Sequence, residues 1–246
     1  MKKAFFVHIP KTAGNSVRQS LRSHNILSNP GHEKKEREHH FGSKSAKRVK
    51  GSHLSFKTET WPSYSEVKEY KESDFSFTVL RNPYDMLYSY YSHYIDNSKK
   101  KNWIDNGWAN VNGYHEIVSF ENFIDIYTSI DPKSWHVPSL CENLFGQIFS
   151  EDKKLLVDKA IFVERLDKGL IEIAKILRPG SNIIVSRLNS SPDRKKDYRS
   201  AYNDSMIEKV RKKCSWELES FGYSFESKEP SHEKNIINLR DYVKSA

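Results

Sequence analysis

Cysteine is scarce in this chain, and long hydrophobic runs are lacking. Cys141 and Cys214 lie far apart without CxxC spacing, so two reduced thiols are expected rather than a disulfide framework. No stretch approaches the roughly 20 apolar residues of a membrane span. The apolar start of the chain ends at Pro10 and Lys11, too early for a signal peptide. These features predict a cytoplasmic protein without a membrane span.

Acidic residues are fewer than basic ones: the chain has 32 Asp and Glu and 40 Lys and Arg, which gives a formal charge of +8. A basic balance of this size favours an anionic partner, which could be a nucleotide, a nucleic acid, an acidic polysaccharide or a membrane surface. Composition alone does not choose among them. The 246 residues, 13% of them aromatic, are enough for one large domain with a substantial core.

Short apolar runs alternate with amphipathic segments along the chain. Strands are predicted at residues 4–9, 74–80, 160–163 and 183–185, and helices from Ser16, from Pro83, over 167–178 and over 203–221. Asn82 is typical of a helix N-cap and Gly222 of a C-cap. This order predicts a single α/β domain over 1–246, with a parallel sheet flanked by helices on both faces. A polar tail is expected from about residue 226.

The first candidate site is the segment HIPKTAGNS, residues 8–16, between a predicted strand and a helix. A helix N-terminus offers free N–H groups and positive potential to an anion. Lys11 adds a charge, Thr12 and Ser16 add hydroxyls, and Ala13 and Gly14 are small. The spacing is not that of a Walker A motif, and the next strand ends in Arg81 rather than a magnesium-binding Asp. An ordinary strand–turn–helix with a surface lysine is the alternative.

The second candidate site begins where the next predicted strand ends. Ligands of open α/β sheets bind outside the carboxyl ends of the strands, and Arg81 is placed there. Its guanidinium is suited to a forked contact with phosphate, and Ser89 could add a hydroxyl two helical turns further on. The alternative is that Arg81 makes a structural ion pair.

Taken together, the two segments resemble the nucleotide-binding motifs of carbohydrate sulfotransferases, the group with the heparan 2-O and chondroitin enzymes. The first resembles the loop that binds the 5′-phosphosulfate of 3′-phosphoadenosine-5′-phosphosulfate (PAPS), which implies a cofactor-binding role for Lys11, Thr12, Ala13, Gly14, Asn15 and Ser16. Lys11 is also implied in catalysis, near the oxygen that bridges phosphate and sulfate. RNPYDMLYS resembles the 3′-phosphate motif, with Arg81 and Ser89 as the phosphate ligands. The resemblance implies a P-loop-like fold and 3′,5′-ADP as product.

Sulfuryl transfer to an alcohol needs a base, and histidine is the natural one. Among ten histidines, His53 in GSHLSF resembles the catalytic histidine segment of the 2-O branch, with Ser52 inserted; His40 is the second candidate. Related enzymes close a loop over the nucleotide late in the chain, which points to Ser190 and Lys195 on the 3′-phosphate side. No metal is expected, because the sulfuryl group bears less negative charge than a phosphoryl group. Zinc binding by His32, His39 and His40, which lack a recognised ligand spacing, is a minor alternative.

Two other functions stay open at this point. A P-loop nucleotide kinase would require ATP and Mg²⁺, and a non-enzymatic binder of an anionic polymer would show binding that falls steeply with salt. For the sulfotransferase, the resemblance implies a poly- or oligosaccharide acceptor, with a small molecule or a tyrosine as alternatives, and no nucleic-acid partner is expected. Residues 28–50 and 96–150 carry no further motif, and acceptor specificity is expected there.

Overall fold

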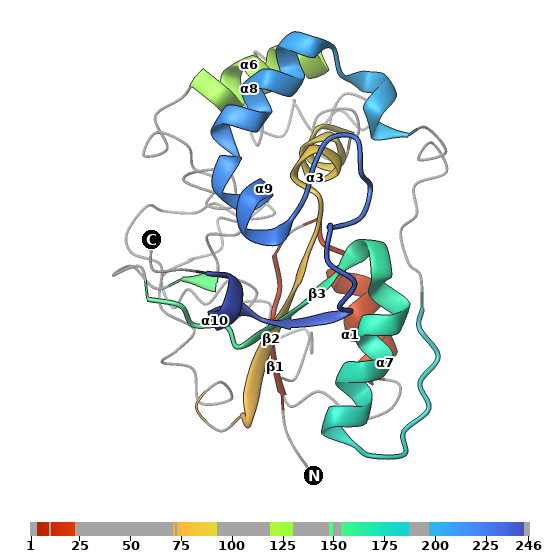
Figure 1. Cartoon of the computed structure of the whole chain (residues 1–246). Helices are drawn as coiled ribbons and strands as arrows, with labels where there is room; N and C mark the ends of the chain where they lie inside the picture. Colours follow the sequence, from red (N-terminus) through yellow and green to blue (C-terminus); the bar gives the residue numbers. More distant parts are fainter. Residues whose placement is uncertain are drawn as a thin grey trace, which may run out of the picture.

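The computed structural model of the chain describes the residues 4–9, 11–22, 71, 73–92, 119–129, 148–149, 154–186 and 197–243. Within these ranges the sheet has the order β1-β2-β3-β4 (Figure 1). Its strands are β1 (Ala4–Val7), β2 (Phe75–Leu80), β3 (Lys159–Phe162) and β4 (Ile236–Asn238). The first three are parallel, and β4 runs antiparallel beside β3.

A helix follows each of the first three strands, as predicted, whereas the single helix predicted over 203–221 is divided into two. The helices are α1 (Gly14–Arg22), α3 (Pro83–Tyr90), α6 (Phe120–Ser129), α7 (Leu166–Leu177), α8 (Asp204–Lys213), α9 (Ser215–Phe221) and α10 (Leu239–Tyr242). Two short 3-10 turns, η9 (Val163–Arg165) and η11 (Tyr198–Ala201), lie between them. Gly222 ends α9 with a φ of 68°, the left-handed C-cap expected of glycine.

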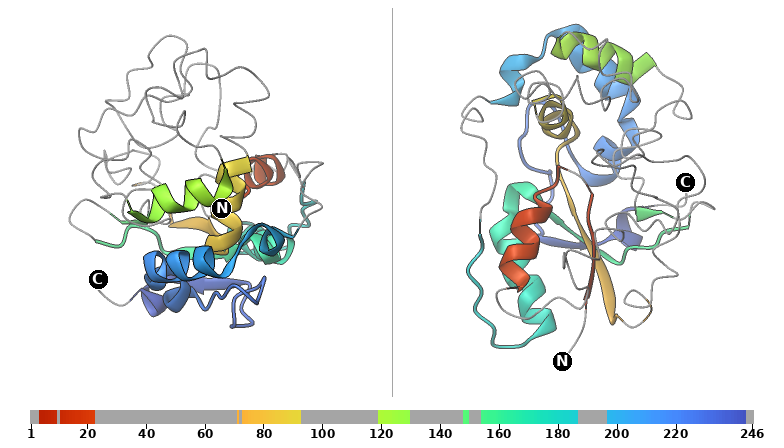
Figure 2. Two further views of the ribbon diagram at one scale, coloured as in Figure 1. Left: turned by 90° about the horizontal axis from the view of Figure 1, so that it is seen from above. Right: turned by 180° about the vertical axis from the view of Figure 1, so that it is seen from behind.

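Helices cover both faces of the sheet, because alternate strand residues point to opposite sides. Helices α1 and α7 cover one face, where Phe6 and Phe77 stack with ring centroids 5.1 Å apart. Helices α3, α6, α8 and α9 pack with the other face, which presents Phe5 and Val7 (Figures 1 and 2). The predicted α/β class with a mainly parallel sheet is confirmed.

Two predictions for the fold were wrong. Residues 183–185 form no strand: Ile183 is buried but Ile184 is 80% exposed, and the nearby Ser186 N–H donates to the Ser20 hydroxyl at 2.8 Å. The segment after Glu226 is not merely a polar tail, since it supplies β4 and α10. Ile237 of β4 and Leu239 of α10 are buried there, so the segment contributes to the core.

The parallel arrangement brings the carboxyl ends of β1 and β2 to one edge of the sheet, because Ala4 pairs with Phe75 and Val7 with Thr78. Strand β1 leads through residues 8–13 into α1, and β2 leads through Arg81 and Asn82 into α3. The two candidate motifs therefore start side by side. Among the described residues, no helix is long and apolar enough to cross a membrane.

Candidate functional site

The turn between β1 and α1 has an unusual backbone. Lys11 and Ala13 have φ values of 65° and 62°, in the left-handed region that L-residues rarely occupy. Each such residue costs about 1–2 kcal/mol and persists only where its surroundings enforce it. The buried Thr12 between them holds the turn, because its hydroxyl donates to the Ile9 carbonyl oxygen at 2.7 Å. Strain of this kind is concentrated at binding sites.

The His8 ring lies directly over Gly14. A Cβ at position 14 would stand 2.1 Å from the ring atoms Cδ2 and Nε2, so only glycine fits. Arg18 reaches back from α1, placing its Nη2 2.6 Å from His8 Nδ1, and its Nη1 donates to Asn15 Oδ1 at 3.3 Å. Because a guanidinium only donates, Nδ1 is the acceptor in this contact. The missing side chain at Gly14 therefore leaves the room that the His8 ring occupies.

Arg81 joins the two motifs. Its side chain is only 2% exposed, and its Nη1 donates to the Lys11 carbonyl oxygen at 2.7 Å. On the other side, Nε donates to Asp85 Oδ2 at 2.9 Å. Nη2 is 2.7 Å from the same oxygen in an ion pair, but it is not aligned for a hydrogen bond to any group of the described residues. A buried guanidinium therefore retains donor capacity at the edge of the sheet where a ligand would bind.

The charges around this edge favour a bound anion. The pKa of Lys11 is lowered to about 8 by burial and by the nearby positive charge of Arg81. Both causes penalise the ammonium form, and an anion placed between the two cations would offset them. Asp85, 26% exposed, compensates part of the charge of Arg81. The arrangement offers two cations and the N-terminus of α1 to one ligand.

Asn82 is the point at which three distant segments meet. Its Oδ1 caps α3 by accepting the Tyr84 N–H at 3.1 Å, as predicted. Its own N–H donates to Glu164 Oε1 at 2.8 Å, and its Nδ2 donates to the carbonyl oxygens of Ser224 and Ser227 at 2.8 and 3.0 Å. Asn82 is fully buried, so these bonds hold the start of α3 firmly beside Arg81.

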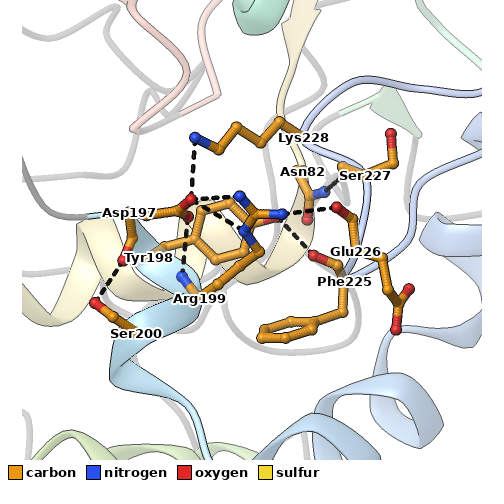
Figure 3. Close-up of polar contacts among 9 residues, drawn as sticks. All are labelled: Asn82, Asp197, Tyr198, Arg199, Ser200, Phe225, Glu226, Ser227 and Lys228. Atoms are coloured by element: carbon orange, nitrogen blue, oxygen red, sulfur yellow. Dashed lines mark hydrogen bonds and ion pairs between the residues drawn. The ribbon is translucent and has the colours of Figure 1, made fainter.

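Residues 224–228, here called the strap, also hold η11 (Figure 3). The Tyr198 hydroxyl donates to the Phe225 carbonyl oxygen at 3.1 Å, and Arg199 Nη1 donates to that of Glu226 at 2.9 Å. Lys228 Nζ lies 3.0 Å from Asp197 Oδ2. The strap therefore links the Arg81 end of the site to η11, which follows the segment of Ser190 and Lys195 in sequence.

The structure brings together some of the predicted residues. Lys11 and Arg81 meet, Thr12, Gly14 and Ser16 are buried around the turn, Ala13 is half-buried and Asn15 is exposed. Ser89 lies half-exposed in the second turn of α3. His53, His40, Ser190 and Lys195 lie outside the described residues. Within the described ranges, no three His, Cys, Asp or Glu side chains are grouped to hold a metal ion.

Sequence reasoning missed several residues of this site. Glu164 and the strap are far from both motifs in sequence, and nothing in their local pattern marks them. His8 and Arg18 lie within or next to the first motif, ten residues apart. Their pairing could have been suspected, because a strand end and the first turns of the following helix lie close together.

Comparison with known proteins gives one match. A family model described as the sulfotransferase family matches residues 2–243, almost the whole chain. No curated protein and no solved structure matches.

Proposed function

The chain belongs to the sulfotransferase family, and we propose that it transfers a sulfuryl group from PAPS to an acceptor hydroxyl and releases 3′,5′-ADP. The observation that carries the proposal is the contact between Arg81 and the Lys11 carbonyl. It joins the two motifs that resemble the 5′-phosphosulfate and 3′-phosphate sites. A nucleotide with anionic groups at both ends requires two such cationic positions.

The described residues fit a PAPS-like ligand by their charge and hydrogen-bonding capacity. Lys11 and the N-terminus of α1 would bind the 5′ end, together with the side chains of Asn15 and Ser16, while Thr12 holds the turn through its bond to Ile9. Arg81 would bind the 3′-phosphate with its remaining donor, and Ser89 would add its hydroxyl. Ser190 and Lys195 are proposed on the same side. The 3′-phosphate is what distinguishes this ligand from ATP.

The reaction requires little covalent chemistry from the protein. The acceptor oxygen attacks sulfur, and the bond from sulfur to the bridging oxygen of the phosphosulfate breaks. The acceptor proton passes to a base, for which we propose His53, and the leaving phosphate carries the released electron pair. Lys11 stabilises the charge that develops on that phosphate. Positioning and electrostatics thus account for most of the catalysis, as in phosphoryl transfer.

We propose a sugar hydroxyl of a poly- or oligosaccharide as the acceptor. The support is the resemblance of the two motifs to those of carbohydrate sulfotransferases and the net charge of +8, which suits an acidic glycan. The residues expected to choose the acceptor, 28–50 and 96–150, lie almost wholly outside the described ranges.

Calorimetric titration with 3′,5′-ADP, compared with ATP plus Mg²⁺, tests the donor site. We expect metal-independent binding of 3′,5′-ADP and much weaker binding of ATP. Preference for ATP with Mg²⁺ would instead support a kinase, and binding of neither nucleotide would contradict the proposed site.

Variants of the two cations test the residue roles. Lys11→Ala and Arg81→Ala should each weaken 3′,5′-ADP binding by about 10- to 150-fold, the loss of a hydrogen bond to a charged group. Lys175→Ala, on the exposed last turn of α7, is the matched control and should change nothing. His53→Ala should abolish turnover and leave the nucleotide affinity nearly unchanged. Full turnover by His53→Ala would show that the base is another residue.

A further inference from the structure

The carboxylate of Glu164 lies behind the Arg81 site. Glu164 follows β3 directly and belongs to η9. Its Oε1 accepts the Asn82 N–H at 2.8 Å, and its Oε2 accepts the Tyr223 hydroxyl at 3.2 Å. One side chain from the middle of the chain therefore holds the residue next to Arg81 and the segment that leads into the strap.

The hydrogen bonds of this carboxylate come from neutral donors. Arg81 directs its own donors to the Lys11 carbonyl and to Asp85. Arg165 turns away to Glu229 and to the carbonyl oxygens of residues 230, 232 and 234. The pKa of Glu164 is raised to about 7, because burial of the carboxylate outweighs the Asn82 N–H and the charge of Arg81, while Asp85 adds to the rise. The residue as a whole is half-buried.

The charges around Glu164 indicate when this carboxylate would take up a proton. Lys11 and Arg81 supply two positive charges to this edge of the sheet, and Asp85 and Glu164 supply two negative charges when ionised. The Tyr223 hydroxyl also contacts Glu164, and burial keeps it neutral by raising its pKa well above the usual value. A phosphate at Arg81 adds negative charge and neutralises the cation that favours the Glu164 carboxylate.

We propose that Glu164 is a positioning residue that binds a proton when a phosphate occupies the Arg81 site. The inference rests on the proposed function. In the protonated acid, Oε1 still accepts the Asn82 N–H, and the Oε2–H donates to the Tyr223 hydroxyl oxygen. The bonds that hold Asn82 are therefore kept while one negative charge is removed. Glu164 positions Arg81 through Asn82 and adjusts its charge to the state of the site.

The test is calorimetry of 3′,5′-ADP binding at pH 7 in buffers with different ionisation enthalpies, which counts the protons taken up. Because the pKa of Glu164 is raised to about 7, the wild type should take up as much as about half a proton more per nucleotide than Glu164→Gln. Contributions from Lys11 and from the nucleotide itself are common to both proteins and cancel in the difference. Glu229→Gln is the matched control, because that carboxylate is exposed and pairs with Arg165; it should behave as wild type.

Affinity as a function of pH provides the second measurement. Between pH 6 and pH 8 the wild-type affinity should fall several-fold more than that of Glu164→Gln, because only the wild type acquires a negative charge there. Glu164→Ala, which cannot hold the Asn82 N–H, should bind weakly at every pH, whereas Glu164→Gln should restore the affinity seen at pH 6.

Each outcome separates the two proposals. Equal proton uptake by wild type and Glu164→Gln would overturn the role of Glu164 and leave the nucleotide site intact. A Glu229→Gln variant that lost as much proton uptake as Glu164→Gln would also overturn it. Failure of the wild type to bind 3′,5′-ADP would overturn the proposed donor site and, with it, this inference.

Discussion

The two halves of the anion site are built in different ways. In the turn between β1 and α1, apart from the Arg81 bond to the Lys11 carbonyl oxygen, the bonds described above join residues 3 to 10 positions apart, such as Thr12 to Ile9 and Arg18 to His8. At the Arg81 end, the bonds of Asn82 reach Glu164, 82 residues away, and the strap, 142 and 145 residues away. The turn is therefore held mainly by contacts within its own segment, whereas the Arg81 end depends on segments that are distant in the sequence.

This difference determines how each half responds to the substitution of its residues. The turn stores backbone strain at Lys11 and Ala13, and nearby contacts within a few residues hold it. Asn82 stores little strain but links β2, η9 and the strap. Altering the turn should therefore change ligand binding with a limited effect on stability. Altering Asn82 should loosen several elements at once.

The halves meet where Arg81 donates to the Lys11 carbonyl oxygen. This carbonyl belongs to a residue with positive φ, so its direction depends on the strained turn. The guanidinium in turn depends on the start of α3 that Asn82 fixes. The contact makes the local half and the long-range half a single site.

The largest expected effect is on stability, from Asn82→Ala. The change removes an N-cap worth about 1 kcal/mol and two partly buried hydrogen bonds of about 0.5–1.5 kcal/mol each, so the free energy of unfolding should fall by about 2–4 kcal/mol. Denaturant unfolding measures this value. Asn203→Ala is the matched control, because Asn203 caps α8 by accepting the Met206 N–H, and among the described residues its Nδ2 bonds the exposed side chain of Glu121 alone.

For Asn203→Ala we expect a loss of about 1 kcal/mol, the ordinary value of a cap. Equal losses in the two variants would contradict the comparison, because the strap bonds of Asn82 would then contribute nothing. Asn82→Asp tests the contribution of the strap bonds separately, since aspartate keeps the cap but cannot donate to the Ser224 and Ser227 carbonyl oxygens.

The same distinction explains what the sequence could predict of the fold. Strands β1, β2 and β3 and the helix after each were predicted, because each carries its own apolar pattern, cap or breaker. Strand β4 was missed because three residues in a polar segment have too short a pattern, and its place depends on pairing with β3. Residues 183–185 mislead in the other direction: three apolar residues suggest a strand, but no described strand pairs with them.

In the site, the residues of the two motifs could be named from the sequence because the functional side chains of each motif lie within one short segment. Glu164, Tyr223 and the strap could not, because each contributes a group that matters only after folding brings it to Asn82. A backbone carbonyl, such as that of Ser224, has no sequence signature at all. The roles of His53, Ser190 and Lys195 stay predictions.

A smaller effect is expected from Gly14→Ala, which tests the local half. Alanine normally favours a helix over glycine by about 1 kcal/mol, but here its Cβ would stand 2.1 Å from the His8 ring. Displacing the ring should cost about 1–3 kcal/mol of stability, as overpacking does. In the double variant His8→Ala/Gly14→Ala the clash is absent, so the penalty of Gly14→Ala should disappear.

The free energies of unfolding of the four proteins give the interaction between the two positions. A Gly14→Ala penalty that persisted without the His8 ring would show that glycine is needed for another reason, and that this half is not closed by local contacts alone.

The smallest expected effect is the dependence of nucleotide binding on pH through Lys11. Its pKa near 8, lowered by burial and by Arg81, means that the free protein loses the ammonium charge as pH rises through 8. A bound phosphate favours the charged form and raises this pKa, so the affinity should be highest below pH 8. Above it, the affinity should fall by at most about tenfold per pH unit, since one proton is involved. Lys11→Arg keeps its charge over this range and should remove the decline between pH 8 and pH 9.5, which calorimetric titration with 3′,5′-ADP would measure. An equal decline of affinity in Lys11→Arg would show that the titrating group lies outside the turn. Anion binding by the turn would then depend on more than its local contacts.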